Sequence, residues 1–134
     1  IYAYRTEIAW DSETSCLGFR EADRTDREFT QWGQVSIPHQ SGHIYLITNR
    51  HGQYRLIVVA RPTINGEMHG ILTTLQVGRG ALLTPVSTPI AFVPMPTENA
   101  VKFGRLTGDD SGFDQYQALL KSTLDESYVR FLAP

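Results

Sequence analysis

The chain has 134 residues, with 12 Lys or Arg against 14 Asp or Glu, and its net charge is −2. A near-neutral chain without a basic stripe lacks the electrostatic footprint of a nucleic-acid-binding protein, so we expect no direct nucleic-acid contact. No apolar run reaches the roughly 18 residues that a membrane span requires. The length suits one domain over residues 1–134, large enough to form a core without disulfides.

The start of the chain and its single cysteine give expectations about the full-length protein and its compartment. The sequence begins at Ile1 without a charged and then apolar leader. We therefore expect a domain excised or trimmed from a longer protein, which favours a module that regulates a fused domain. Cys16 is the one cysteine and cannot form an internal disulfide, which fits a reducing compartment. We expect a cytoplasmic location, with a processed exported domain as the alternative.

The N-terminal third predicts three short strands at residues 1–10, 15–22 and 33–38, separated by polar turns. Residues 20–28 mix three arginines with four acidic residues, a pattern typical of a surface loop. Trp10 and Trp32 are expected in the core or lining a pocket.

Residues 42–77 predict a meander of three strands. Asn65 and Gly66 together favour a type I′ hairpin turn, because both of its central residues need a positive φ. Pairing outward from a two-residue turn sets Val58 opposite Thr73. A second turn at residues 49–52 joins the first two strands of the meander.

Both faces of this meander are apolar at their centres, although a half-exposed antiparallel sheet usually alternates apolar with polar residues. We expect the core on the face that carries His43, Tyr45, Ile47, Tyr54, Leu56, Val58, Ala60, Ile71, Thr73, Leu75 and Val77. The opposite face has a polar fringe, and it needs a cover.

The C-terminal quarter supplies the expected cover. Aromatic and leucine side chains recur every three or four residues from 113 to 131, which predicts a helix that ends by Pro134 and is either continuous or broken near Ser122 and Thr123; residues 127–132 alone also fit a strand. Asp110 or Ser111 suits its N-cap. Residues 85–96, with four prolines, predict an edge strand.

These elements predict an α+β, mostly β fold, in which an antiparallel curved sheet or partial barrel of about six to eight strands has a C-terminal helix packed on it. PAS-like and lipocalin-like topologies both fit this expectation.

Four residues of the expected core face are candidate ligand-binding residues. His43, Tyr45, Tyr54 and Thr73 carry hydrogen-bonding groups among apolar neighbours, which is the composition of a small-molecule cavity. The structural alternative is that His43 is a core histidine whose ring nitrogens are hydrogen-bonded to nearby hydroxyls. Arg55 and Arg61, on the other face, are candidates for an anion or partner contact; the simpler interpretation keeps their head groups in water.

Catalytic and metal motifs are missing from the sequence. His39, His51 and His69 show no HExxH spacing, and we expect no metal site. The "GDDSG" segment at 108–112 is explained as a helix start, and GxSxG is absent. We name no catalytic residue, and the residues indicate no particular cofactor.

Two functions follow as hypotheses. The first is a ligand-sensing or regulatory module that binds a small molecule in a mostly apolar cavity and signals to another domain. The second is a protein-interaction or structural domain that binds through its proline-rich edge at 85–96 and the charged loop at 20–28. A small enzyme using histidines is the third and weakest possibility. The oligomeric state stays open.

Overall fold

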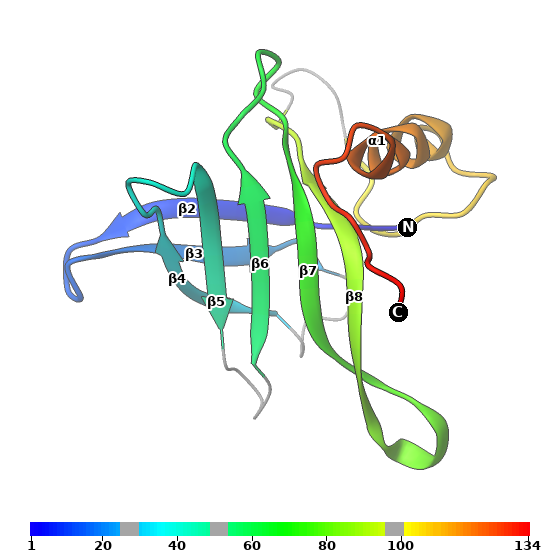
Figure 1. Cartoon of the computed structure of the whole chain (residues 1–134), viewed down its shortest axis with the longest axis horizontal. Coiled ribbons are helices and arrows are strands. Elements are labelled where there is room, and N and C mark those ends of the chain that lie inside the picture. Colours follow the sequence, from blue (N-terminus) through cyan, green and yellow to red (C-terminus); the bar gives the residue numbers. More distant parts are fainter. Residues whose placement is uncertain (25–29, 49–53, 96–100) are drawn as a thin grey trace.

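The structure is a computed structural model that describes residues 1–24, 30–48, 54–95 and 101–134. Its main sheet has seven antiparallel strands in sequence order from β2 to β8, and it is not closed into a barrel (Figure 1). The strands are β2 (Arg5–Asp11), β3 (Cys16–Ala22), β4 (Trp32–Ser36), β5 (His43–Thr48), β6 (Arg55–Ala60), β7 (Met68–Val77) and β8 (Leu83–Phe92). The predicted mostly β fold class with a C-terminal helix is confirmed.

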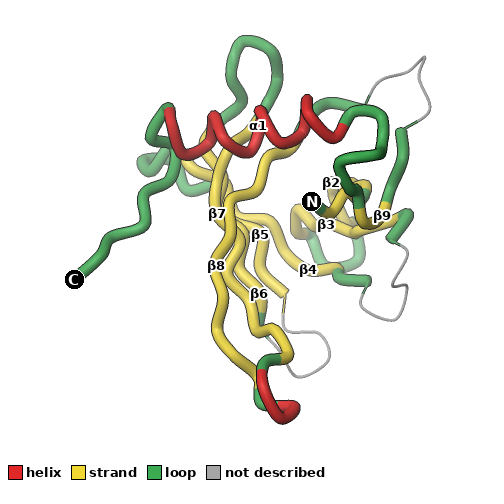
Figure 2. Tube along the Cα trace, turned by 90° about the vertical axis from the view of Figure 1, so that its right-hand side faces the viewer, coloured by secondary structure: helices red, strands yellow, loops and turns green. Residues whose placement is uncertain are grey.

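The remaining elements are short. β1 (Tyr2–Ala3) pairs with β9 (Gly104–Arg105), a two-stranded sheet that the sequence did not predict. A single 3₁₀ turn, η3 (Arg79–Ala81), joins β7 to β8. The one α-helix of the described residues is α1 (Phe113–Asp125). It lies across one end of the sheet (Figure 2).

The predicted register of the meander is wrong by two residues, because the turn is of another type. Thr73 pairs with Leu56, not with Val58. Gly66 takes a φ of 81°, whereas Asn65 keeps a negative φ. The Gly66 N–H donates to the Thr63 carbonyl, so this is a longer hairpin loop with one left-handed residue. A shift of two leaves every side chain on its predicted face.

The core lies on the face that was expected to need a cover. Leu46, Ile57 and Val59 are buried there, together with Phe19 of β3 and Val35 of β4. These strands are consecutive in the sheet, but β3 and β6 are separated by β4 and β5, so Phe19 joins Ile57 and Val59 in one cluster only because the sheet curls with this face inward. Figure 2 shows β2, β3 and β4 on one side of β5–β8. We call this side of β5–β8 the inner face and the opposite side the outer face.

The curl of the sheet therefore replaces the helix as the cover of the inner face. No helix residue belongs to this core cluster. The helix instead contacts β8, and it buries Thr123 and half-buries Phe113 and Tyr116. The helix ends at Asp125, well before Pro134. Two residues after this end, Ser127 takes a left-handed φ of 60°.

Two smaller expectations are also wrong, the N-cap of the helix and the core position of the tryptophans. Asp110 and Ser111 do not cap α1, whose N-cap position is Gly112 with no side-chain hydrogen bond. Asp110 instead accepts hydrogen bonds from the backbone and hydroxyl of Thr107. Trp10 and Trp32 are exposed by 65% and 43%, so they are not core residues.

Candidate functional site

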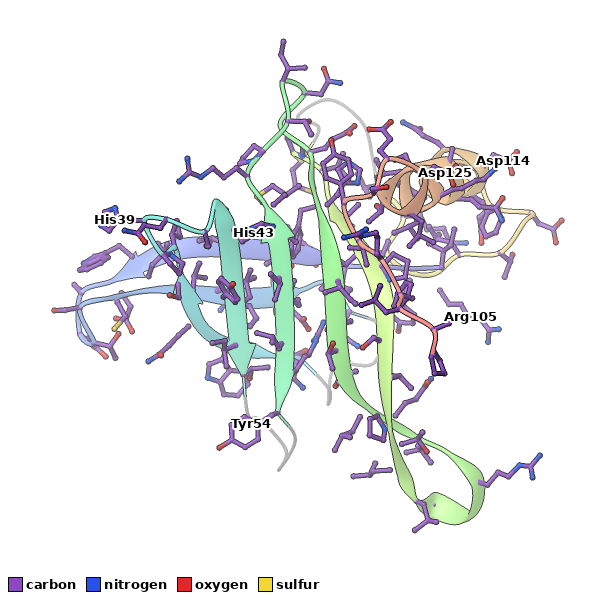
Figure 3. The ribbon with its side chains drawn as sticks, in the orientation of Figure 1. His39, His43, Tyr54, Arg105, Asp114 and Asp125 are labelled. Atoms are coloured by element: carbon purple, nitrogen blue, oxygen red, sulfur yellow. The ribbon has the colours of Figure 1, made fainter. Side chains whose placement is uncertain are left out.

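The four predicted ligand-binding residues lie on the outer face, not inside the curl. His43 and Thr73 are exposed, Tyr45 is half-buried, and Tyr54 is 74% exposed. Figure 3 shows His43 and Tyr54 toward opposite ends of the sheet. The interior position expected for them is wrong, and whether they bind a ligand stays a prediction.

The register also separates these residues along the strands. His43 is in the row of Ala60, whereas Tyr45 is in the row of Val58 and Ile71. Thr73 is one row further, opposite Leu56. Rows on one face are two residues, or roughly 7 Å, apart. The structure thus places these residues on one face but does not gather them.

The outer face of β5–β8 bears no formal charge. Alternation along the four strands directs sixteen side chains outward, and none of them is Asp, Glu, Lys or Arg. They are His43, Tyr45, Ile47, Leu56, Val58, Ala60, His69, Ile71, Thr73, Leu75, Val77, Leu83, Pro85, Ser87, Pro89 and Ala91. An antiparallel sheet with one solvated face normally places polar residues there, so this composition needs an explanation.

Large apolar side chains of this face stand in solvent. Ile47 is 44% exposed, Leu56 38%, Val77 69% and Leu83 47%. Ile47 and Leu56 are directly paired, and so are Val77 and Leu83. The hydroxyls of Thr73 and Ser87 bond to each other at 2.9 Å and so satisfy part of their own polarity. Exposed apolar side chains that share one charge-free face mark an interaction site more often than scattered exposed leucines do.

The free edge of β8 is less suited to binding. The predicted edge strand is confirmed, since β8 is the last strand of the sheet. Pro85 and Pro89 pair with Leu75 and Ile71. Prolines are tolerated in such a strand where the missing N–H faces solvent, and they block the addition of another strand. The face, not the edge, is the sheet surface open to a partner.

One end of the outer face is covered by the segment that follows α1. His69 is 3% exposed, and its ring stacks on Tyr128 with 4.6 Å between ring centres. Its Nδ1 lies 2.8 Å from the hydroxyl of Thr123, and its Nε2 lies 3.4 Å from the Glu67 carboxylate. Figures 1 and 2 show the terminal segment on the side of β8 away from β2–β4.

This arrangement of acid, imidazole and hydroxyl has the components of a nucleophile site, but its position argues for a structural role. Thr123 is 0% exposed, so no substrate reaches its hydroxyl. Buried polar groups must be hydrogen-bonded, and His69 and Thr123 satisfy one another. The contact joins β7 to α1.

A second polar cluster braces the inner face. Glu21 of β3 is 2% exposed, and its carboxylate lies 2.5 Å from the guanidinium of Arg55 and 2.9 Å from that of Arg24. Arg55 also donates to the hydroxyl of Tyr4 at 2.5 Å. Burial raises the pKa of the Tyr4 phenol. Because β3 and β6 are not neighbours in the sheet, the Glu21–Arg55 pair holds the curl together.

The prediction that Arg55 keeps its head group in water is therefore wrong; Arg61 is exposed. The sequence carries part of a signal for the Glu21–Arg55 pair, although it does not show which face of β6 is inward. Glu21 follows Leu17 and Phe19 at a spacing of two, and Arg55 precedes Ile57 in the same way. Each charge thus falls on the inward phase of its strand, which is where a charge needs a partner.

A cluster of metal ligands and a membrane-spanning helix are both absent from the described residues. Among them, no three His, Cys, Asp or Glu side chains come together as a metal site. None of their helices is long and apolar enough to cross a membrane. His51, the turn at 49–52 and residues 25–28 of the charged loop lie outside the described residues.

Comparison with known proteins gives no relative from which a function could be transferred. The chain matches no protein-family model, no curated protein and no solved structure.

Proposed function

We propose that this domain is a protein-interaction module that binds a protein partner on the outer face of β5–β8. The observation that supports it is a sheet face of sixteen outward side chains without a formal charge. Interfaces are depleted of charge at their centres and enriched in tyrosine; Tyr45 belongs to this face, and Tyr54 lies at its margin, directly before β6. This places the binding surface elsewhere than the loop and edge predicted from the sequence.

Burial of this face would offset its exposure to water. Ile47, Leu56 and Val77 each leave more than a third of their surface in solvent. Each Å² of apolar surface removed from water is worth about 25 cal/mol, although association costs reduce the net gain. A partner with an apolar surface of its own is therefore the class that this face fits.

A small-molecule sensor is the second proposal. It is favoured by the hydroxyls of Tyr45 and Thr73, which stand among apolar side chains on the same face. A ligand that binds there in the folded state would raise the midpoint of thermal unfolding, and the stabilisation would grow with the logarithm of the ligand concentration above its Kd. A metabolite screen that raises the midpoint for wild type but not for Thr73→Val would support the sensor.

The test of the interaction module compares two variants that introduce the same charge at two different positions. Leu56→Asp puts a charge on the outer face, whereas Ile64→Asp puts the same charge on a hairpin loop where Ile64 is 101% exposed. Immobilised wild type and Ile64→Asp should capture the same proteins from a cell extract, and Leu56→Asp should lose them. Circular dichroism and thermal unfolding verify that all three are folded. Identical capture by all three contradicts the proposal.

A further inference from the structure

We propose that the partner on the outer face is a second copy of this chain, so that two sheets pack face to face about a twofold axis. This inference rests on the proposed function, which it deepens by naming the occupant. It draws on three observations: the charge of the face, its size and the state of the neighbouring edge.

Charge is the first observation. A twofold interface brings the same patch of both copies together, so it must be complementary to itself. A face with acidic or basic groups meets its own charges across such an axis, and like charges at an interface cost several kcal/mol. The sixteen outward side chains of β5–β8 include no Asp, Glu, Lys or Arg. The face is therefore self-compatible, and the net charge of −2 on each copy adds little repulsion.

Size is the second observation. The face spans four strands of six to ten residues. With strands about 4.8 Å apart and about 3.3 Å for each residue, its footprint is roughly 19 by 25 Å. Two such faces would bury roughly 1,000 Å² together, and less once the end covered by Tyr128 is left out, so the contact lies at the lower limit of a specific interface. The inference is thus a dimer of modest affinity, not an obligate one.

The state of the β8 edge is the third observation. Two copies of a β domain can also join edge to edge into one continuous sheet. At the β8 edge, which borders the outer face, Pro85 and Pro89 oppose this mode, because a proline in the edge strand donates no hydrogen bond to an added strand. Face-to-face packing has no such obstacle. Two sheets then stack about 10 Å apart and within about 30° of parallel, as in a β-sandwich.

The geometry assigns the contact to the part of the face away from His69. Tyr128 already covers His69. The open part carries Ile47, Leu56 and Val77, with Tyr54 at its margin. Tyrosines are frequent hot spots of binding energy, so Tyr54 is expected to contribute.

Sedimentation velocity over a wide range of protein concentration tests the dimer. The wild type and Ile64→Asp should shift from monomer to dimer as the concentration rises. Leu56→Asp should weaken the self-association at least about thirtyfold, the effect of losing one hot spot. Val77→Asp, at a position that is 69% exposed, gives the same test if Leu56→Asp does not fold.

The outcomes separate this inference from the proposed function. A wild type that stays monomeric at every concentration overturns the dimer. If that monomer still captures a protein in a Leu56-dependent manner, the interaction module stands and the second copy alone is wrong. A dimer that neither Leu56→Asp nor Val77→Asp weakens lies on another surface and also overturns the inference.

Discussion

Glu21 shows how a single buried residue can connect two strands that are not neighbours in the sheet. Its carboxylate is buried between the guanidinium groups of Arg55 and Arg24, and the backbone N–H of Gln31 donates to it at 3.3 Å. A buried ion pair is weak evidence for net stability, because desolvation offsets the Coulombic gain. Removal of one partner is a different matter, since it leaves the others charged and buried.

We therefore expect Glu21→Gln to lower the free energy of unfolding by about 3 to 5 kcal/mol. The variant keeps the shape of the side chain but leaves Arg55 and Arg24 without a counter-charge. Glu7→Gln is the matched control, because Glu7 forms its pairs with Arg5 and Arg20 while 48% exposed. Pairs of that kind are worth about 1 kcal/mol or less. Urea unfolding of both variants measures the difference, and equal losses would contradict the role of Glu21.

The Glu21–Arg55 pair also shows which contacts the pattern of neighbouring residues cannot predict. Arg55 follows Tyr54 in a strand whose two faces are both apolar, so alternation alone did not show which side is inward. The buried partner, Glu21, lies 34 positions earlier. A pairing over that distance becomes visible only when the sheet is curled, because β3 and β6 are separated by two other strands.

At the scale of elements, the strands were predictable and their register was not. Alternation and turn residues located all seven strands of the main sheet. The register failed at the Asn65–Gly66 turn, where the same dipeptide fits a two-residue loop or a longer loop with one left-handed glycine. The helix was located by its periodicity, but its end was not, because aromatic residues continue the pattern beyond Asp125 into a segment that packs without being helical.

Gly70 gives the test at this scale, because close approach of two strands depends on it. A Cβ atom added to Gly70 would lie 1.9 Å from the carbonyl oxygen of Val58 and 2.7 Å from the Cα of Val59. These are backbone atoms of the neighbouring strand β6, so the clash is relieved only if β6 and β7 separate. We expect Gly70→Ala to lower the free energy of unfolding by about 3 kcal/mol or more.

Gly108→Ala is the matched control for that substitution. No heavy atom lies within 4 Å of a Cβ added at Gly108, and its φ is not in the left-handed region. The control should stay within about 0.5 kcal/mol of the wild type in the same urea titration. A Gly70→Ala variant as stable as this control would mean that the two strands have room for a side chain.

For the whole molecule, the fold class predicted from the sequence is confirmed, but the face of the meander predicted to be buried is the exposed one. The meander offers Leu56 and Val58 on one face and Ile57 and Val59 on the other, so its own hydrophobicity favours neither. The choice comes from Phe19 and Val35, which complete the core from strands that the meander does not contain. Because the other face turned out to be buried, the predicted ligand-binding residues lie on an exposed face and not in a cavity.

An open, curled sheet also predicts an uneven distribution of stability. β5 and β6 lie in the middle of the sheet, and they carry Leu46, Ile57 and Val59, all at most 2% exposed. β2 is an edge strand, and most of its side chains are exposed. Amides that open only through global unfolding are found where both neighbours and the core hold a strand in place, whereas edges open locally at lower free energy.

We therefore expect native-state hydrogen exchange to separate the two regions. The amides of β5 and β6 should exchange with a free energy of opening close to that of global unfolding, and those of β2 with a clearly smaller one. Low concentrations of urea should speed exchange steeply in β5 and β6, because global unfolding exposes much surface, and weakly in β2. The Glu21→Gln variant should lower protection in β5 and β6 and change that of β2 little, since Glu21 connects β3 to β6 and the local opening of β2 leaves this contact intact. Equal free energies in β2 and β6 would show a single cooperative unit and would contradict this division.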